Sequence, residues 1–218
     1  MSAEPGRFLT VEGIEGVGKT TQIGRIAKML AERGIAHVVT REPGGTPLAE
    51  EIRDLVLKSR GEALPDAAEL LLMFAARSVH LRNLIEPNLS LGRWVLCDRF
   101  TDATYAYQGA GRGLEESSIR QLELLVQGTR RPDLTLLLDV PVQLGLQRAR
   151  ERNAAACIGH ADDRFEAQRQ EFFERVRAAY LARAAAEPGR IAVIDARRPA
   201  DEVTAQITAV LASRAWIS

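Results

Sequence analysis

The sequence predicts a single α/β domain spanning residues 1–218, with a five-stranded parallel sheet flanked by helices in three layers. Short apolar segments that suit strands alternate along the 218 residues with longer segments of helical period. One of the short segments, Leu134 to Leu138, is almost continuously apolar, which is typical of a strand buried on both faces. A glycine-rich loop also joins the first strand to the first helix, as in many ligand-binding parallel sheets.

The five strands are predicted where apolar or β-branched residues cluster between turn signals. They are expected at Arg7–Val11, Ala36–Thr40, Trp94–Cys97, Leu134–Leu138 and Ile191–Ile194. In parallel sheets flanked by helices, ligands bind where the carboxyl ends of the strands meet. Candidate site residues are therefore sought in the segments that follow the strands, which are Gly13–Thr21, Arg41–Thr46, Asp98–Phe100 and Asp139.

Helices are predicted from apolar residues at helical spacing and from proline at helix starts. The first runs from Thr21 and ends at Gly34. A long apolar-striped helix from Leu64 is expected to stop at Glu86, because Pro87 follows it. The charged stretch 151–163 is predicted as a loop. The other helices are expected at Pro47–Ser59 and Leu114–Gln127, from Pro141, from the end of that loop to Ala186, and from Pro199.

The composition argues against several classes of protein. The 29 basic and 29 acidic residues balance, whereas general nucleic-acid or membrane-surface binders normally have a basic excess. No apolar run reaches the ~20 residues that span a bilayer, and the start of the chain lacks the features of a signal peptide. Cys97 and Cys157 have no metal or redox spacing, so a reducing cytoplasm is the expected compartment and Cys97 is expected to be buried.

The most specific motif is a phosphate-binding loop of the pattern Gly-x-x-x-x-Gly-Lys-Ser/Thr. Its glycines let the backbone curl so that several N–H groups point at one anion, and the helix that follows adds its positive end. Lys19 supplies a charge for the β- and γ-phosphates, and the Thr20 hydroxyl can bind Mg²⁺. The residues predicted to bind a nucleoside triphosphate, which the resemblance given below identifies as ATP, are Gly13, Ile14, Glu15, Gly16, Val17, Gly18, Lys19, Thr20 and Thr21.

Charged residues after the third and fourth strands are further candidates. Asp98 is placed to hold Mg²⁺ or its water shell, and Arg99 to bind a phosphate through two hydrogen bonds. The alternative for this pair is a structural ion pair at the sheet edge. Asp139 is interpreted as a cap for the helix near Pro141.

Four arginines late in the chain have two interpretations. Such a run is commonly an exposed helix face. In a phosphoryl-transfer enzyme, however, arginines of a closing lid neutralise the charge of the transition state, and the lid excludes water. Because the variable positions of the phosphate-binding loop include the acidic Glu15 and no basic residue, we expect a lid at about 148–164 to supply the arginine. The four residues are Arg148, Arg150, Arg152 and Arg164.

Together these motifs resemble the thymidylate kinase family over nearly the whole chain. The resemblance implies a P-loop nucleoside monophosphate kinase that phosphorylates dTMP to dTDP with ATP and Mg²⁺, in dTTP synthesis. It also implies a homodimer that forms through apolar helices around 65–86 and 101–126. Phe100 departs from the Tyr or His that the family often has. The matching segments are Glu12–Thr21, Thr40–Thr46, Asp98–Phe100, Thr104–Gly109 and the arginine-bearing lid.

The resemblance also implies roles for the matching residues. Phe74 would stack on thymine, Arg77 would bind its edge, and Tyr107 would crowd the sugar 2′-position. Glu15 would face the 3′-hydroxyl. Catalysis would rest on Lys19, Arg99, Glu15 and one of Arg148, Arg150 and Arg152, and Mg²⁺ would be organised by Thr20, Asp98 and Glu42. The dTMP-binding set is Glu15, Glu42, Arg53, Phe74, Arg77, Arg99, Thr104, Tyr107 and Gln108.

Simpler explanations exist for some residues, and other functions fit the loop. Phe74 could belong to the core, Tyr107 could pack between helices, and Arg53 could simply be exposed. The functional alternatives are a kinase of another nucleoside monophosphate or of a deoxynucleoside, and a nucleotide-driven switch. The Asn-Lys-x-Asp pattern of guanine specificity is absent, which counts against a GTPase. In a monophosphate kinase, direct in-line transfer would need neither a covalent intermediate nor a strong base.

Overall fold

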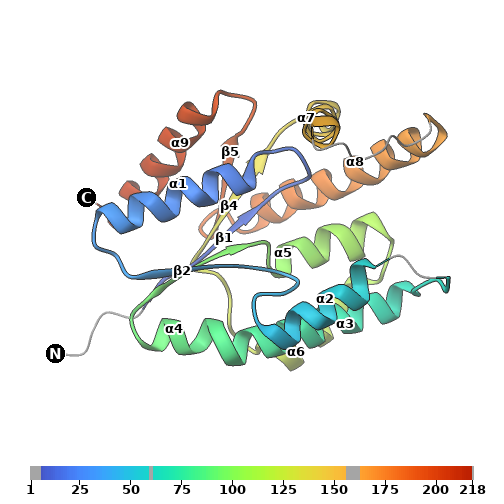
Figure 1. Cartoon of the computed structure of the whole chain (residues 1–218), viewed down its shortest axis with the longest axis horizontal. Coiled ribbons are helices and arrows are strands. Elements are labelled where there is room, and N and C mark those ends of the chain that lie inside the picture. The colour runs from blue at the N-terminus through green and yellow to red at the C-terminus, as the bar shows by residue number, and fades with distance from the viewer. Residues whose placement is uncertain (1–5, 59–60, 156–162, 218) are drawn as a thin grey trace.

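The chain folds around a parallel sheet with the strand order β2-β3-β1-β4-β5. A computed structural model describes residues 6–58, 61–155 and 163–217, with only the backbone at 153, 155 and 163–168. Helices cover both faces of the sheet (Figure 1), so the predicted three-layer α/β fold is confirmed. The strands are β1 (Phe8–Glu12), β2 (His37–Arg41), β3 (Trp94–Asp98), β4 (Leu134–Asp139) and β5 (Ile191–Asp195).

Each strand continues one position beyond its predicted carboxyl end. The prediction followed apolar side chains, whereas the hydrogen bonds between strands are made by the backbone and tolerate a charged residue. In the observed register Arg41 pairs with Asp98, and Asp139 pairs with Asp195. The sheet therefore brings the last residues of its strands to one edge, and all of them are charged: Glu12, Arg41, Asp98, Asp139 and Asp195.

The helices pack on the sheet in two layers. α1 contacts β1, β2 and β3 and lies beside α9, which contacts β5. On the other face α8 contacts β4, β5 and η2, and α4 contacts β3. The helices are α1 (Lys19–Glu32), α2 (Pro47–Leu57), α3 (Asp66–His80), η1 (Leu81–Ile85), α4 (Glu86–Ser90), α5 (Thr101–Thr104), η2 (Tyr105–Gly111), α6 (Glu116–Gln127), α7 (Val142–Ala155), α8 (Asp163–Ala186) and α9 (Ala200–Ser213), of which η1 and η2 are π-helices.

The prediction that Pro87 ends the long helix is wrong. α3 continues through η1 into α4, and Pro87 lies in the first turn of α4. Proline in an α-helix removes a hydrogen bond and crowds the carbonyl four residues earlier. The wider π-turn of η1 changes that register just before the proline. α3, η1 and α4 therefore form one continuous helical rod, and Pro87 lies within it.

Two other boundaries differ from the prediction. The helix predicted at Leu114–Gln127 is α6, but the prediction omitted the helical segment of α5 and η2 that precedes it from Thr101, because the glycines of η2 lower its helix propensity. The predicted loop from Glu151 is helical as far as Ala155, since charge marks an exposed helix as readily as a loop. Cys97 is a buried free thiol, as expected, and Cys157 lies outside the described residues. Within the described ranges, every helix is too short or too polar to cross a membrane.

A buried ion cluster ties α8 to the rest of the molecule. Asp102, which is only 2% exposed, accepts hydrogen bonds from Arg183 Nε and Arg190 Nη1, both at 2.7 Å. Burial alone would raise the pKa of Asp102, but Arg190 and Arg183 hold it below its ordinary value. Asp102 is therefore a charged group that the fold stabilises through two arginines.

We predict that Asp102→Ala lowers the free energy of unfolding by about 3 kcal/mol, because it leaves two partly buried arginines without their carboxylate. Urea unfolding measures the effect. The matched control is Asp201→Ala, which breaks an ion pair with Arg25 whose carboxylate side is 91% exposed. That change should cost less than about 1 kcal/mol. Equal losses in the two variants would contradict the role given to Asp102.

Candidate active site

The phosphate-binding loop lies between β1 and α1, at the carboxyl edge of the sheet. Gly18 has a φ of 91° and precedes the first residue of α1, so the loop turns directly into the helix. Lys19 Nζ donates to the carbonyl oxygens of Gly13 and Ile14 at 3.2 and 3.0 Å. Burial and the nearby Arg99 lower the pKa of Lys19 to about 7. A polyanion in the loop would favour the charged form of this lysine.

The loop is also in direct backbone contact with α7. A Cβ atom at Gly16 would lie 1.9 Å from the carbonyl oxygen of Gly145. Conversely, a Cβ atom at Gly145 would lie 2.8 Å from the carbonyl oxygen of Glu15. Only glycine fits at both positions. The helix that leads into the predicted lid is therefore packed against the loop without intervening side chains.

A cleft of about 670 Å³ opens beside the start of α1. Thr20 and Asp98 both line it, together with the end of β2 and the turn after it. Asp98 Oδ1 is buried and has no hydrogen-bond partner among the described residues. Among those residues, no three His, Cys, Asp or Glu side chains come together as a metal site. Thr20 and Asp98 nevertheless suit Mg²⁺, which usually takes one or two protein oxygens and completes its shell with phosphate and water.

Glu42 does not fit the predicted metal role. Its two oxygens accept hydrogen bonds from Arg77 Nε at 2.7 Å and from His80 Nδ1 at 2.9 Å, and its side chain is 3% exposed. Nε2 of the same histidine is 2.7 Å from Thr40 Oγ1. Because both carboxylate oxygens are already engaged, Glu42 serves to hold Arg77 in place.

Arg77 is the largest fully buried side chain of the described residues, at 1% exposure. Its guanidinium lies over the rings of Phe74 and Phe100, at 4.8 and 5.0 Å from their centroids. Nη2 donates to Thr104 Oγ1 at 3.0 Å, whereas Nη1 is buried with no partner among the described residues. These contacts fix the guanidinium of Arg77 and leave its Nη1 available to donate to another group.

Gln108 has a buried acceptor without a described partner, whereas Arg77 has a buried donor. Its Nε2 donates to Glu69 Oε1 at 2.8 Å, while its Oε1 is buried and has no described partner. Phe74 lies in the core with Leu70, Tyr105 and Ile119 and is 1% exposed. The core interpretation of Phe74 therefore holds in this structure, and stacking on a base stays a prediction.

Arg99 adopts a left-handed backbone with a φ of 68°, which costs a non-glycine residue roughly 1–2 kcal/mol. Its Nη2 donates to Tyr107 Oη at 2.9 Å and its Nη1 to Tyr180 Oη at 3.3 Å. Burial alone would lower the pKa of Arg99, but Tyr107, Tyr180 and Glu12 raise it above its ordinary value. Arg99 is thus a permanently charged group at the carboxyl edge of the sheet. Tyr107 contacts it directly as well as packing against α8 residues.

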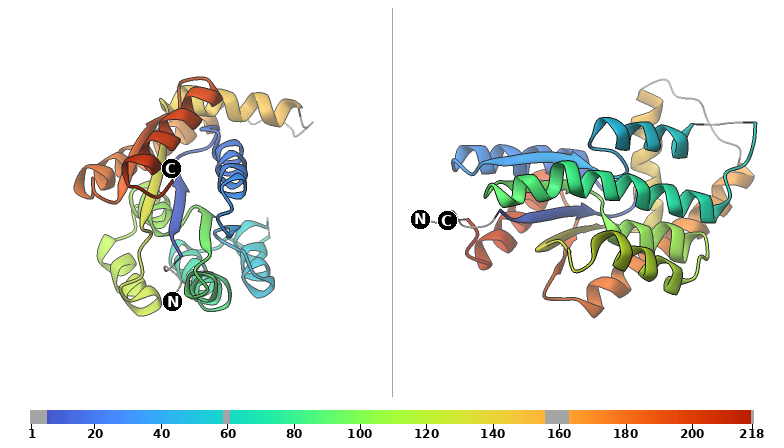
Figure 2. Two further views of the ribbon diagram at one scale, coloured as in Figure 1. Left: turned by 90° about the vertical axis from the view of Figure 1, so that its left-hand side faces the viewer. Right: turned by 90° about the horizontal axis from the view of Figure 1, so that it is seen from below.

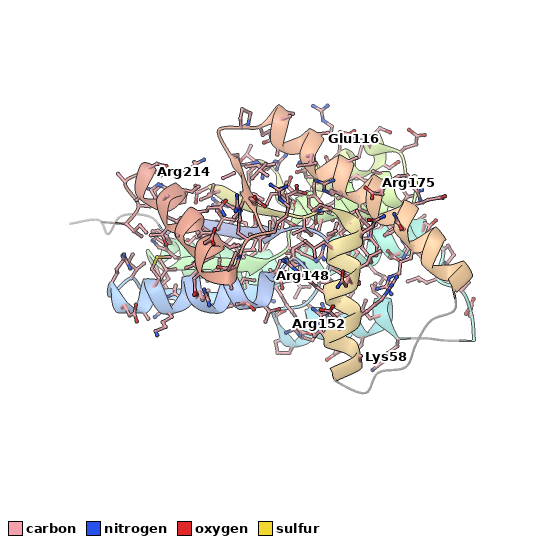
Figure 3. The ribbon with its side chains drawn as sticks, turned by 90° about the horizontal axis from the view of Figure 1, so that it is seen from above. Lys58, Glu116, Arg148, Arg152, Arg175 and Arg214 are labelled. Carbon is pink, nitrogen blue, oxygen red and sulfur yellow. The ribbon has the colours of Figure 1, made fainter. Side chains whose placement is uncertain are left out.

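The lid arginines lie on α7, which projects from the body of the molecule (Figure 2). Arg148 is near the sheet and Arg152 farther out (Figure 3). Arg148 donates to the carbonyl oxygens of Ala196 and Arg197 at 2.8 and 3.2 Å, so it holds the loop after β5. Arg150 and Arg152 are exposed. The side chain of Arg164 lies outside the described residues.

Arg169 is the site residue that sequence reasoning missed. Its Nη2 donates to Glu15 Oε2 in the phosphate-binding loop at 2.6 Å. The sequence signal that could have found it is helical spacing. Arg169 lies one turn before Phe173 and on the same helix face as Tyr180, and because Phe173 and Tyr180 are buried, that face points toward the body of the protein. Motif spacing did not reveal it, because the contact joins residues that are 154 positions apart.

Asp139 and Arg53, two further predicted residues, make contacts that the sequence did not indicate. Asp139, interpreted as a helix cap, binds Arg177 through both oxygens at 2.7 and 2.8 Å. Arg53 is half-buried and donates to the carbonyl oxygen of Pro43 at 2.7 Å, in the turn after β2. Its placement beside that turn is compatible with the predicted site.

The known proteins that this chain resembles, in sequence and in structure, are thymidylate kinases. The thymidylate kinase family model matches residues 11–207. A thymidylate kinase of Teredinibacter turnerae is 55% identical over 207 residues, which cover 94% of this chain and 97% of that protein. One from Chromohalobacter salexigens is 56% identical over 211 residues, covering 96% and 97%. The crystal structure of the Ehrlichia chaffeensis thymidylate kinase matches with a TM-score of 0.73 and 36% identity, covering 95% of this chain and 99% of that one.

We predict that Gly145→Ala weakens ATP binding at least about 10-fold, because the new methyl group would push Glu15 and the loop out of place. Titration with a non-hydrolysable ATP analogue measures the affinity. Gly24→Ala, in α1, is the matched control because a Cβ atom there meets nothing within 4 Å. If the two variants bind the analogue equally well, the contact between α7 and the loop does not shape the donor site.

We also predict a pH dependence of stability that comes from Glu12. Burial, aided by Asp102, raises the pKa of Glu12 from 4.5 to about 7. Between these values the folded state keeps a proton that the unfolded state has lost, so stability falls as the pH rises through this window. Urea unfolding at several pH values should show the advantage of wild type over Glu12→Gln shrinking by about 3 kcal/mol from pH 4.5 to 7. A constant difference would show that Glu12 titrates normally.

Proposed function

The chain belongs to the thymidylate kinase family, and we infer that it phosphorylates dTMP to dTDP with ATP as donor, a step of dTTP synthesis. The donor phosphates would lie in the loop Gly13–Thr21, at the start of α1. The acceptor would lie on the other side of the cleft, toward Arg99 and the buried pair Arg77 and Gln108. This division places the two substrates at the edge where all five strands end.

Two buried polar atoms without described partners are the observation that carries the proposal, because they suit recognition of a base. Arg77 Nη1 is a buried donor and Gln108 Oε1 a buried acceptor, and neither has a partner among the described residues. Leaving such groups unpaired is costly, so a ligand that pairs with both gains affinity. Thymine offers the matching groups, an acceptor at O4 and a donor at N3. Cytosine has the reverse pattern on the same edge.

The acceptor phosphate would be bound by Arg99. Its guanidinium has five N–H donors, and the two tyrosine hydroxyls take two of them. A phosphate is a suitable partner for the remaining donors, because arginine binds it through two parallel hydrogen bonds. Tyr107 lies against Arg99 and would also limit the space at the sugar 2′-position. Glu15, which Arg169 contacts here, would face the 3′-hydroxyl.

Transfer would be in-line, from the γ-phosphate of ATP to an oxygen of the dTMP phosphate. The acceptor oxygen is already anionic, so the residues position the two phosphates and neutralise their charge. Lys19 would bind the donor phosphates and Arg99 the acceptor. When bound, Mg²⁺ would neutralise charge on the donor phosphates. Thr20 and Asp98 would hold it.

A lid arginine would complete the charge balance. Arg148 donates to the loop after β5, and Arg150 and Arg152 are exposed farther along α7, so the lid arginine stays one of the predicted three. The lid at about 148–164 would close over the donor, and α7 would transmit that motion to the loop through the contact of Gly145 with Glu15. The expected compartment stays the reducing cytoplasm, in line with the free thiol of Cys97.

We predict that dTMP is the preferred acceptor in a panel of dTMP, dUMP, UMP, dCMP and thymidine assayed with ATP and Mg²⁺. Discrimination against dCMP should reach at least about 100-fold in kcat/KM, because cytosine would leave Arg77 Nη1 and Gln108 Oε1 unpaired or opposed. Equal turnover of dCMP would contradict this account of base recognition. Hydrolysis of ATP that no monophosphate stimulates would favour a nucleotide-driven switch instead.

We also propose that the protein is a homodimer, through α3 and α6. These helices pack together and leave three leucines exposed, Leu71 at 57%, Leu124 at 69% and Leu125 at 79%. Apolar surface that gathers on neighbouring helices is typical of a protein interface.

Light scattering should give about twice the chain mass of 23.9 kDa, and Leu125→Glu should shift the protein toward the monomer, because a charge would be buried in the interface. Leu91→Glu is the control, since Leu91 is similarly exposed, at 66%, but lies after α4. A monomeric wild type, or equal effects of the two changes, would contradict this interface.

A further inference from the structure

Glu12 is a buried carboxylate with no assigned role in the reaction. It is the last residue of β1, its exposure is 0%, and it lies just before the phosphate-binding loop. Its Oε1 accepts a hydrogen bond from the backbone N–H of Phe100 at 2.7 Å. Its Oε2 accepts one from the hydroxyl of Tyr180 on α8, also at 2.7 Å. Both oxygens therefore contact groups adjacent to Arg99: the N–H of the residue that follows it and a hydroxyl that accepts from its side chain.

The first contact fixes the backbone of Arg99. The N–H of Arg99 donates to the carbonyl oxygen of Val11 at 3.1 Å, and the next N–H, that of Phe100, donates to Glu12. Two successive residues of β1 thus hold the left-handed turn on either side of Arg99, whose φ is 68°. A strained backbone persists only where its surroundings determine it in this way.

The second contact fixes the side chain. The hydroxyl of Tyr180 donates its hydrogen bond to Glu12. The lone pairs of the hydroxyl oxygen are therefore left to accept a hydrogen bond from Arg99 Nη1, which lies 3.3 Å away. Tyr107 Oη accepts from Nη2 at 2.9 Å on the other side of the guanidinium. The plane of the guanidinium is thereby set by two hydroxyl groups, one of which is oriented by Glu12.

We propose that Tyr180, oriented by Glu12, is a positioning residue that sets the guanidinium of Arg99 for the acceptor phosphate. The proposal rests on the role given to Arg99 under the proposed function. Tyr180 also connects that guanidinium to α8, the helix that follows the lid segment and whose Arg169 contacts Glu15. Acceptor binding would therefore be linked to the position of α8 through this hydroxyl group, in addition to the packing of Tyr107 on α8.

Tyr180→Phe tests this directly, because it removes the hydroxyl and keeps the ring that packs beside Tyr107. We expect kcat/KM for dTMP to fall about 10- to 100-fold, the range for a lost hydrogen bond to a charged group, with the KM for ATP unchanged. The matched control is Tyr105→Phe, which removes another tyrosine hydroxyl bound to a buried glutamate, Glu123, at 2.5 Å. Tyr105→Phe should leave kcat/KM near that of wild type. An equal loss in this control would overturn the proposal, because it would show a general effect on packing.

A double-mutant cycle separates positioning from direct action. If Tyr180 acts only through Arg99, Tyr180→Phe should have no effect on dTMP turnover or dTMP affinity in the Arg99→Ala background. The same loss in both backgrounds would overturn the proposal while leaving the function of Arg99 intact. Arg99→Ala with wild-type turnover would instead refute the acceptor role of Arg99, and the proposal with it.

Glu12→Gln provides an independent test if Tyr180→Phe fails to fold. The amide keeps the shape of the carboxylate, but only one of its two terminal atoms can accept, so it cannot serve Phe100 and Tyr180 together. Above pH 7, where Glu12 is ionised because its pKa is about 7, we expect the same fall in kcat/KM for dTMP and the same absence of effect in the Arg99→Ala background. Normal kcat/KM in folded Glu12→Gln would overturn the proposal.

Discussion

The site depends on how one edge of the sheet accommodates its charges. The parallel register brings the last residue of every strand to this edge, and four of the five are carboxylates. Such a concentration of like charge is unfavourable unless each group finds a partner of opposite charge or a hydrogen-bond donor. Two of the four pair directly with an arginine, Asp139 with Arg177 and Asp195 with Arg197.

The two central carboxylates are treated differently, and this difference defines the site. Glu12 is paired indirectly, through a tyrosine, with Arg99. Asp98 keeps one buried oxygen without a described partner, in the wall of the cleft. Two substrates that carry several phosphates would bring a large negative charge to the same place. A cation beside Asp98, the permanent charge of Arg99 and the charged form of Lys19 that bound phosphates favour would therefore balance both the protein and its ligands.

Much of this arrangement could be predicted from the sequence, since the phosphate-binding loop and the alternation of strands and helices are local patterns. The failures have one physical origin, which is that long-range contacts decide what a local pattern leaves open. Glu42 has the chemistry of a metal ligand, but Arg77 and His80, 35 and 38 positions away, occupy its oxygens. Arg169 looks like any exposed arginine until the fold brings Glu15 within reach. Pro87 predicts a helix end because proline disrupts the hydrogen bonding of a regular α-helix, and the π-turn of η1 changes that hydrogen bonding just before it.

The π-turn of η1 has a consequence for chain length in this region. Ahead of it, α3 packs Leu70 and Phe74 against Tyr105 and Ile119. Within η1 and beyond it, the same rod packs Leu81, Ile85 and Leu89 against Phe8 and Val95 of the sheet. Each residue added to a helix turns everything beyond it by about 100°. With α4 held against the sheet, an insertion or deletion within 81–85 would therefore rotate α3, and Arg77 with it, away from the acceptor side even if every side chain were kept. The packing of the rod therefore constrains the length of this segment more tightly than its composition.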